Sequence, residues 1–282
     1  CMANLVLQSR FLNGKTKHNA LIKTMKKLFF VLTSLLCFNG IIKAQELEYN
    51  KYSAFKPGEI LNYKLKYGFF TAAEASLKVS ATDVKFNGKP TYHLTVEGST
   101  SGSFDIFYKV RNRYDSYIDQ KEFTPFLYTE NIREDRYTRN DKVRFYQESK
   151  SVIGKKGTFK SPASQTFDLV STYYFARNLN LAGVKAGDQF TIHYFLDDEI
   201  TPLTIEYVGK ETIKTNLGKI ECIKFSPSIR PGRIFRKNSR LYLWISNDAN
   251  RIPVKAQAEV IVGAITMEIT SATGLKESLK TK

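Results

Sequence analysis

Cysteine, histidine and tryptophan are scarce in this chain. Its 282 residues include three cysteines, three histidines and one tryptophan. Only Cys222 lies beyond position 44, so residues 45–282 cannot form an internal disulfide. A zinc site needs about four converging ligands, often closely spaced, and neither an HxH nor an HExxH pattern occurs. We therefore expect no metal and no cofactor, and we interpret Cys222, in the alternating segment KIECIKF, as a buried, inert thiol.

Acidic residues are absent from the first 44 positions, which hold seven of the 43 lysines and arginines. From Met25 the segment MKKLFFVLTSLLCFNGIIKA combines two lysines, an apolar run over 28–38 and a small residue, Ala44. This order is typical of a secretory signal peptide, and the run is shorter than the ~20 residues that span a bilayer. We interpret 1–24 as upstream sequence, 25–44 as the signal peptide and 45–282 as a single β-rich domain, exported to the periplasm or outer envelope without a transmembrane span.

Apolar and polar residues alternate along most of the chain after Gly58. The segment 241–269, LYLWISNDANRIPVKAQAEVIVGAITMEI, fits three strands separated by SNDAN and by Gly263. Further turns are expected at NGKP (87–90), TRND (138–141) and IGKKG (153–157). A period of two without a longer repeat predicts a mainly β fold, built on a large curved antiparallel sheet with one covered face.

One segment departs from the period of two. SPASQTFDLVSTYYFARNLNLAG predicts a helix over 165–178, with Ser164 or Thr166 as the N-cap and Gly183 soon after its end. Its apolar arc is wide and aromatic. We therefore expect the helix to lie in or over the concave face of the sheet.

Few residues in this chain suggest catalysis. The densest acidic cluster, Asp197 to Glu199 in FLDDEIT, could supply paired carboxylates or a calcium contact. Its position between two strands favours an ordinary turn instead. GKKGTFKSP lacks the order of a phosphate-binding loop, and no GxSxG motif occurs. We expect that the protein is not an enzyme.

A basic loop offers a candidate contact surface. SIRPGRIFRKNSR, residues 228–240, joins cationic side chains to an apolar tip. Such a loop could contact anionic head groups or an acidic partner, and the alternative is a solvated hairpin loop. Nucleic acid is not expected, because export separates the chain from it. The candidate contact residues are Arg230, Arg233, Ile234, Phe235, Arg236 and Lys237.

Four blocks carry a resemblance to a known family. They are KPGEILNYKLKYGFFTAAEASLKV, SFDIFYKVRNRYDSYID, FDLVSTYYFAR and LYLWISNDANRIPVKAQAEVIVGAI, in this order. The chain resembles the bacterial family called domain of unknown function 3108, although TAAEA replaces a stretch in which that family commonly has Gly. The resemblance implies an exported envelope protein without established catalytic residues.

The last block is also similar to the lipoprotein-carrier class, in which a half-barrel closes over short helices. That likeness implies that the concave face holds acyl chains and that Tyr173, Tyr174, Phe175 and Trp244 line the ligand. Binding by shape and apolar area contributes ~0.8 kcal/mol per buried CH₂. The first hypothesis is thus a non-catalytic binding module for a lipid-like or other hydrophobic ligand. The alternatives are a structural or assembly partner of outer-envelope proteins and, third, an enzyme that uses the acidic cluster.

Overall fold

The computed structural model describes residue 49 and residues 53–102, 104–228, 239–260 and 263–282. Residues 44–282 form one compact unit. The predicted upstream segment and signal peptide lie outside the described residues, as do all six candidate contact residues of the basic loop. In the part of the chain that is described, no helix is long and apolar enough to cross a membrane.

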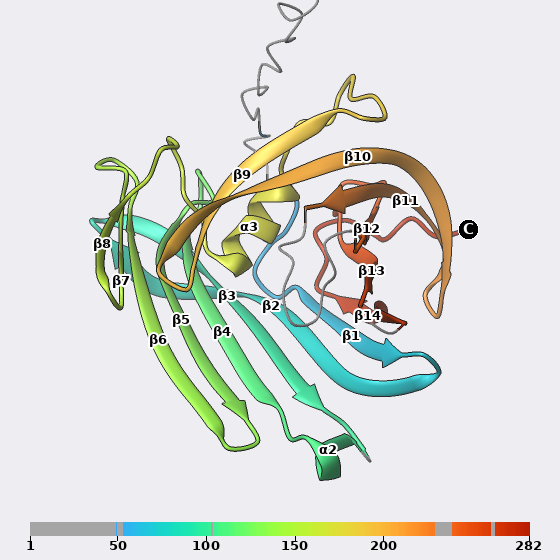
Figure 1. Cartoon of the computed structure of the whole chain (residues 1–282). Helices are drawn as coiled ribbons and strands as arrows, with labels where there is room; N and C mark the ends of the chain where they lie inside the picture. The colour runs from blue at the N-terminus through green and yellow to red at the C-terminus, as the bar shows by residue number, and fades with distance from the viewer. Residues whose placement is uncertain (1–48, 50–52, 103, 229–238, 261–262) are drawn as a thin grey trace, which may run out of the picture. The chain divides into compact units, whose positions relative to one another are not determined.

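Within these ranges, fourteen strands form one antiparallel sheet that does not close into a barrel. Strands β1 to β8 follow each other in space, β9 to β14 do the same, and β1 pairs with β14 between the two runs (Figure 1). The strands are β1 (Ile60–Tyr67), β2 (Phe70–Phe86), β3 (Lys89–Thr100), β4 (Arg111–Asp119), β5 (Pro125–Glu134), β6 (Tyr137–Tyr146), β7 (Ser151–Gly154), β8 (Gly157–Lys160), β9 (Gln189–Leu196), β10 (Glu199–Thr215), β11 (Gly218–Pro227), β12 (Leu241–Ser246), β13 (Pro253–Glu259) and β14 (Ala264–Thr273).

Among the described residues, two short helices interrupt the strands. Helix α2 (Phe104–Phe107) lies between β3 and β4, and α3 (Leu169–Ala176) lies between β8 and β9. Helix α3 contacts β3, β4 and β9, so it lies inside the curve of the sheet (Figure 1). The predicted fold class, a large curved antiparallel sheet with a short helix on its concave face, is confirmed.

The N-terminus of α3 differs from the prediction. Asp168 is the N-cap, and its carboxylate accepts hydrogen bonds from the backbone N–H groups of Val170 and Ser171, both at 2.8 Å. Ser164 and Thr166 are not caps. The backbone directly before Asp168 is hydrogen-bonded to β9 instead. The Phe167 N–H donates to the His193 carbonyl, and the Phe167 carbonyl accepts from the Phe195 N–H. Residues 165–168 of the predicted helix are therefore extended or irregular instead. At the other end α3 stops at Ala176, and the last two predicted residues, Arg177 and Asn178, are the C-cap and a turn residue.

Most predicted turns are confirmed, and one is wrong. Asn87 and Gly88, with φ of 52° and 77°, connect β2 to β3, and the SNDAN and IGKKG segments also connect strands. Residues 138–141 do not form a turn, because they lie within β6. The turn is Asp135 and Arg136, where Glu134 pairs with Tyr137. Asp135 adopts φ of 48°, a conformation that Asp tolerates better than most residues.

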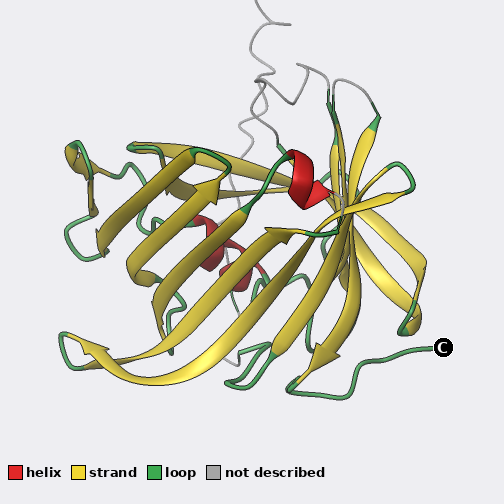
Figure 2. Cartoon of the chain, turned by 90° about the horizontal axis from the view of Figure 1, so that it is seen from below, coloured by secondary structure: helices red, strands yellow, loops and turns green. Residues whose placement is uncertain are grey.

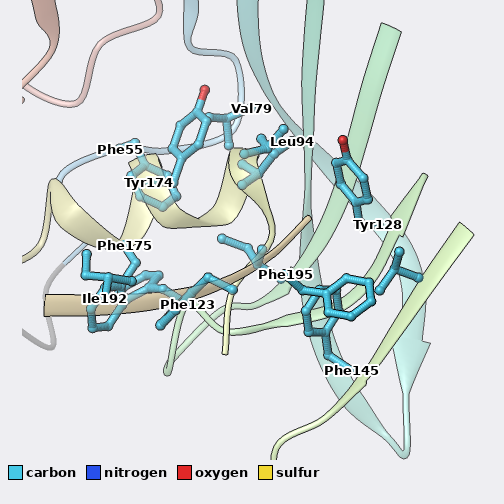
Figure 3. Packing of buried hydrophobic residues seen from close by; sticks show 14 of the residues in the cluster. Phe55, Val79, Leu94, Phe123, Tyr128, Phe145, Tyr174, Phe175, Ile192 and Phe195 are labelled. Atoms are coloured by element: carbon cyan, nitrogen blue, oxygen red, sulfur yellow. The ribbon is translucent and has the colours of Figure 1, made fainter. Parts of the chain in front are cut away.

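The core between α3 and the sheet is aromatic (Figure 3). Phe55 contacts Tyr174 with ring centroids 4.9 Å apart, and Phe167 contacts Phe175 at 4.4 Å. Leu94 and Ile118 supply fully buried aliphatic side chains from β3 and β4. Helix and sheet therefore bury their apolar faces against each other.

The pairing register shows which side chains of β1 to β6 lie on the same face of the sheet. Residues directly opposite each other in a sheet share a face. One cross-strand row, Val79, Leu94, Ser116, Tyr128 and Val143, faces the buried core. The opposite face is polar, as the row Asn62, Ser76, Glu97, Arg113, Asn131 and Asn140 shows. Figure 2 views the sheet with α3 behind these strands.

Candidate functional site

A groove of about 650 Å³ lies on the polar face of the sheet. Residues of β1 to β5 and of β14 line it. This volume is within the range of small-molecule sites, roughly 300–1,000 Å³. The lining residues are Asn62, Tyr63, Lys64, Glu74, Ala75, Ser76, Glu97, Gly98, Ser99, Arg111, Asn112, Arg113, Asn131, Arg133 and Thr270.

A chain of alternating charges fixes one side of this groove. Lys78 Nζ lies 2.7 Å from Glu97 Oε2, and Arg113 Nη1 lies 3.0 Å from Glu97 Oε1. Arg113 also donates two hydrogen bonds of 2.8 Å to Asp115, whose Oδ1 lies 2.7 Å from His93 Nε2. Each charge therefore faces an opposite one. Such a network orders the side chains before any ligand binds.

The pKa of Asp115 shows how strongly this network stabilises its anion. Burial alone raises the pKa of Asp115, but the hydrogen bonds from His93 and Arg113 outweigh burial and hold it well below its ordinary value. Hydrogen bonding from Lys78 similarly lowers the pKa of Glu97, against a smaller opposite effect of burial. In the folded protein both carboxylates therefore bind fewer protons than in the unfolded chain at mildly acid pH.

We expect the Asp115→Asn variant to lose stability at neutral pH and to have a flatter acid limb. Because the folded pKa of Asp115 is depressed, its contribution is complete above the ordinary Asp pKa of about 4. It is lost as pH falls through the folded pKa. Thermal unfolding followed by circular dichroism from about pH 7 to 2 tests this slope. Asp83→Asn, at an exposed position, is the control, and an acid limb equally steep in wild type and Asp115→Asn contradicts the expectation.

The groove carries more positive than negative charge. Its lining includes four cationic side chains and two carboxylates. Lys64 and Arg133 are exposed, and neither forms an ion pair among the described residues. The Arg133 guanidinium donates only to Asn131 Oδ1, at 3.1 Å. The guanidinium therefore has unused donors for a carboxylate or phosphate.

A buried ion pair anchors α3 beneath the other face. Arg177 and Glu59 have side chains 1% and 0% exposed. The guanidinium of Arg177 donates to Glu59 Oε1 at 2.5 Å and to Glu59 Oε2 at 2.8 Å, and it also donates to the carbonyl of Asn250. Burial opposes its charge, but Tyr173 and Glu59 together raise the pKa of Arg177 above its ordinary value. The sequence gives one signal of this pair, an arginine at the end of an otherwise apolar helix, and that signal was missed.

Of the four predicted ligand-lining residues, three are buried in the core and one is half-buried. Tyr174 and Phe175 are 0% exposed, and Trp244 is 4% exposed and donates to Glu211 Oε2 at 2.9 Å. Tyr173 is half-buried, with its ring beside the Arg177 guanidinium. Three cavities lined by described residues, of about 650, 290 and 250 Å³, include none of the four. Their role in binding a ligand stays a prediction.

The acidic cluster forms a strand connection. Asp197 and Asp198 have φ of 52° and 59° and form the two-residue turn between β9 and β10. Asp197 accepts a hydrogen bond from Arg139, and Asp198 accepts one from the backbone N–H of Lys156. Both contacts join this turn to the other end of the open sheet. The interpretation as turn residues is therefore confirmed for Asp197 and Asp198, whereas Glu199 is the first residue of β10.

Cys222 is buried, as the sequence predicted. Its side chain is 0% exposed, and burial raises the pKa of its thiol to about 12. A thiol with this pKa is almost entirely protonated at neutral pH and is a poor nucleophile.

The described residues contain no group of three or more His, Cys, Asp or Glu side chains suited to a metal ion.

No curated protein matches this chain. Among solved structures, a β-barrel-like protein of the domain of unknown function DUF1849 from Brucella abortus has a TM-score of 0.50 and 10% identity, covering 78% of this chain and 97% of that chain. A hypothetical protein from Chlamydia trachomatis has a TM-score of 0.36 and 8% identity, covering 80% of this chain and 92% of that chain. The first likeness shows a shared barrel-like fold. The model of the DUF3108 family, described as a protein of unknown function, matches residues 62–270, and the chain belongs to this family.

Proposed function

We propose that this protein is a non-catalytic binding module of the cell envelope and that its groove on the polar face binds an anionic ligand. The observation that carries the proposal is the preorganised groove with its excess of cations. The envelope location rests on the signal-peptide pattern of residues 25–44. A carboxylate or phosphate is the ligand group that unpaired arginine best recognises.

The interior of the curve offers less support for a hydrophobic ligand. Helix α3 fills it, and Tyr174 and Phe175 are fully buried there. A lipid-like ligand in this place requires that α3 move away from β3, β4 and β9. Such a movement would expose the apolar side chains that α3 buries against the sheet, which makes it costly. The polar groove needs no such rearrangement.

We expect the Arg133→Ala variant to bind its anionic ligand about 10- to 100-fold more weakly than wild type, because a hydrogen bond to a charged group contributes roughly 1.5–3 kcal/mol. Native mass spectrometry of protein purified gently from an envelope extract measures the fraction that retains a ligand. Arg144→Ala is the matched control, because Arg144 is exposed on the same face and outside the groove.

The outcomes separate the hypotheses. Loss of a co-purifying anionic species in Arg133→Ala but not in Arg144→Ala supports the proposal. Equal retention in all three proteins counts against the groove. Stoichiometric recovery of a neutral lipid, unaffected by either substitution, would move the binding site to the interior and restore the hydrophobic-ligand hypothesis.

A further inference from the structure

The four most exposed large apolar side chains of the described residues, Phe69, Phe70, Ile106 and Phe107, lie at neighbouring strand ends, with two partly exposed tyrosines beside them. We call this group the apolar end, and it comprises Tyr67 (42% exposed), Phe69 (101%), Phe70 (67%), Ile106 (83%), Phe107 (84%) and Tyr108 (50%). Three of them lie at the β1–β2 turn and three in or beside α2. Because β1 to β4 are consecutive neighbours in the sheet, both connections project from the same end of it.

The β1–β2 turn has an unusual composition for a solvated hairpin. Tyr67 pairs with Phe70, so Gly68 and Phe69 are the two turn residues. Four other two-residue turns of this sheet are polar, namely Asn87-Gly88, Asp135-Arg136, Lys155-Lys156 and Asp197-Asp198. A further one, Asn216-Leu217, holds a leucine that packs against a core cluster and is not exposed like Phe69. Polar residues suit such positions because water surrounds them. Two adjacent phenylalanines at a turn therefore point to an apolar environment outside the protein.

Helix α2 holds its apolar residues outward through polar contacts on its other side. Arg111 donates to both carboxylate oxygens of Asp105, at 2.8 and 2.7 Å, and Thr100 Oγ1 donates to Asp105 at 2.6 Å. These contacts attach α2 to β3 and β4 through Asp105. Ile106 and Phe107 are exposed. Helix α2 itself lies beyond the end of β3 (Figure 1).

Three cations lie at the same end of the sheet as the apolar end, which also carries the carboxylates of Glu134 and Asp135. Lys109 follows α2, Arg136 occupies the next strand connection, and Arg240 precedes β12 beside Glu259 of β13. All three are exposed, and none forms an ion pair within the described ranges. The two apolar tips are two strands apart, or about 10 Å, so several side chains can reach one planar boundary together.

We propose that the apolar end docks on an anionic lipid surface. Phe69, Phe70, Ile106 and Phe107 enter the boundary between head groups and acyl chains, and the three cations contact lipid phosphates. Aromatic side chains flanked by cations suit this boundary. This inference is independent of the ligand proposed for the groove.

Vesicle flotation tests the proposal with protein purified after expression of the full chain. We expect wild type to float with phosphatidylglycerol-containing vesicles, and the fraction bound to fall as salt rises. The Phe69→Ser, Phe107→Ser double variant should bind at least about a hundredfold more weakly, because both tips lose the apolar side chain that enters the boundary. The matched control replaces Val84 and Ile153, which are 42% and 39% exposed elsewhere on the sheet, with serine.

Insertion itself is measured at the tips. In Phe69→Trp and Phe107→Trp variants we expect a blue-shifted emission on adding vesicles and quenching by brominated acyl chains. Trp244 contributes a constant background, since it is 4% exposed. Equal flotation of the double variant and its control, or no quenching at either tip, would overturn the proposal. Binding that inorganic phosphate abolishes at constant ionic strength would also overturn it, because a free anion site would then explain the result.

Discussion

The Arg177→Met variant is expected to lose about 3–5 kcal/mol of unfolding free energy, because it leaves Glu59 as an unpaired charge in the core. Arg177 is the common donor to three groups of two segments: the Glu59 carboxylate and the Ala54 carbonyl before β1, and the Asn250 carbonyl between β12 and β13. Methionine keeps most of the side-chain volume and removes every donor. Equilibrium urea denaturation measures the loss, since the midpoint shifts at constant slope if only stability changes.

Two further variants show whether the unpaired charge causes this loss. The Glu59→Leu, Arg177→Met double variant should recover part of the stability, because two apolar side chains replace the pair without leaving a buried charge. Arg144→Met, at an exposed position of β6, should unfold like wild type. A double variant less stable than Arg177→Met would refute the explanation, and the hydrogen bonds to the carbonyls would then be the dominant contribution.

The Phe175→Ala variant is expected to lose about 3–5 kcal/mol, the range for removing a large aromatic side chain from a packed core. Phe175 is fully buried, with ring contacts to Phe167 at 4.4 Å and to Tyr49 at 5.4 Å. Leu169→Ala is the control on the same helix, because Leu169 is 44% exposed and should lose little. Urea denaturation of both variants checks the difference.

The result for Phe175 also bears on the hydrophobic-ligand hypothesis. If α3 is a permanent part of the core, the alanine variant is strongly destabilised and wild type carries no lipid in the interior. If α3 is a lid, the alanine variant loses little stability in lipid-free protein. A loss below about 1 kcal/mol would therefore contradict the description of α3 as a core helix.

The groove and the apolar end depend on different features of the fold. The groove depends on register, since a shift of one residue in any of its strands would move its charges to the buried face. The apolar end depends only on which connections share an end of the sheet. Substitutions at Phe69 and Phe107 are therefore expected to leave the groove unchanged, and Arg133→Ala should leave vesicle binding nearly unchanged.

The sequence by itself determined the local features of this protein. Alternation after Gly58 predicted the strands, Asn87-Gly88 and SNDAN predicted turns, and the aromatic run around Tyr174 predicted the helix. Local conformation depends on residues close in the chain, so a period of two or a turn pair is visible without coordinates. The TRND error and the wrong N-cap arose where pairing with a distant strand overrode a local preference.

Only the tertiary structure decided which residues meet. Arg177 and Glu59 are 118 positions apart, and six strands supply the groove. Both depend on the order and register of strands, which come from long-range packing that no local pattern encodes. The choice of concave face likewise follows from where α3 packs, and that choice placed Tyr174 and Phe175 in the core and left the charged row around Arg113 facing solvent.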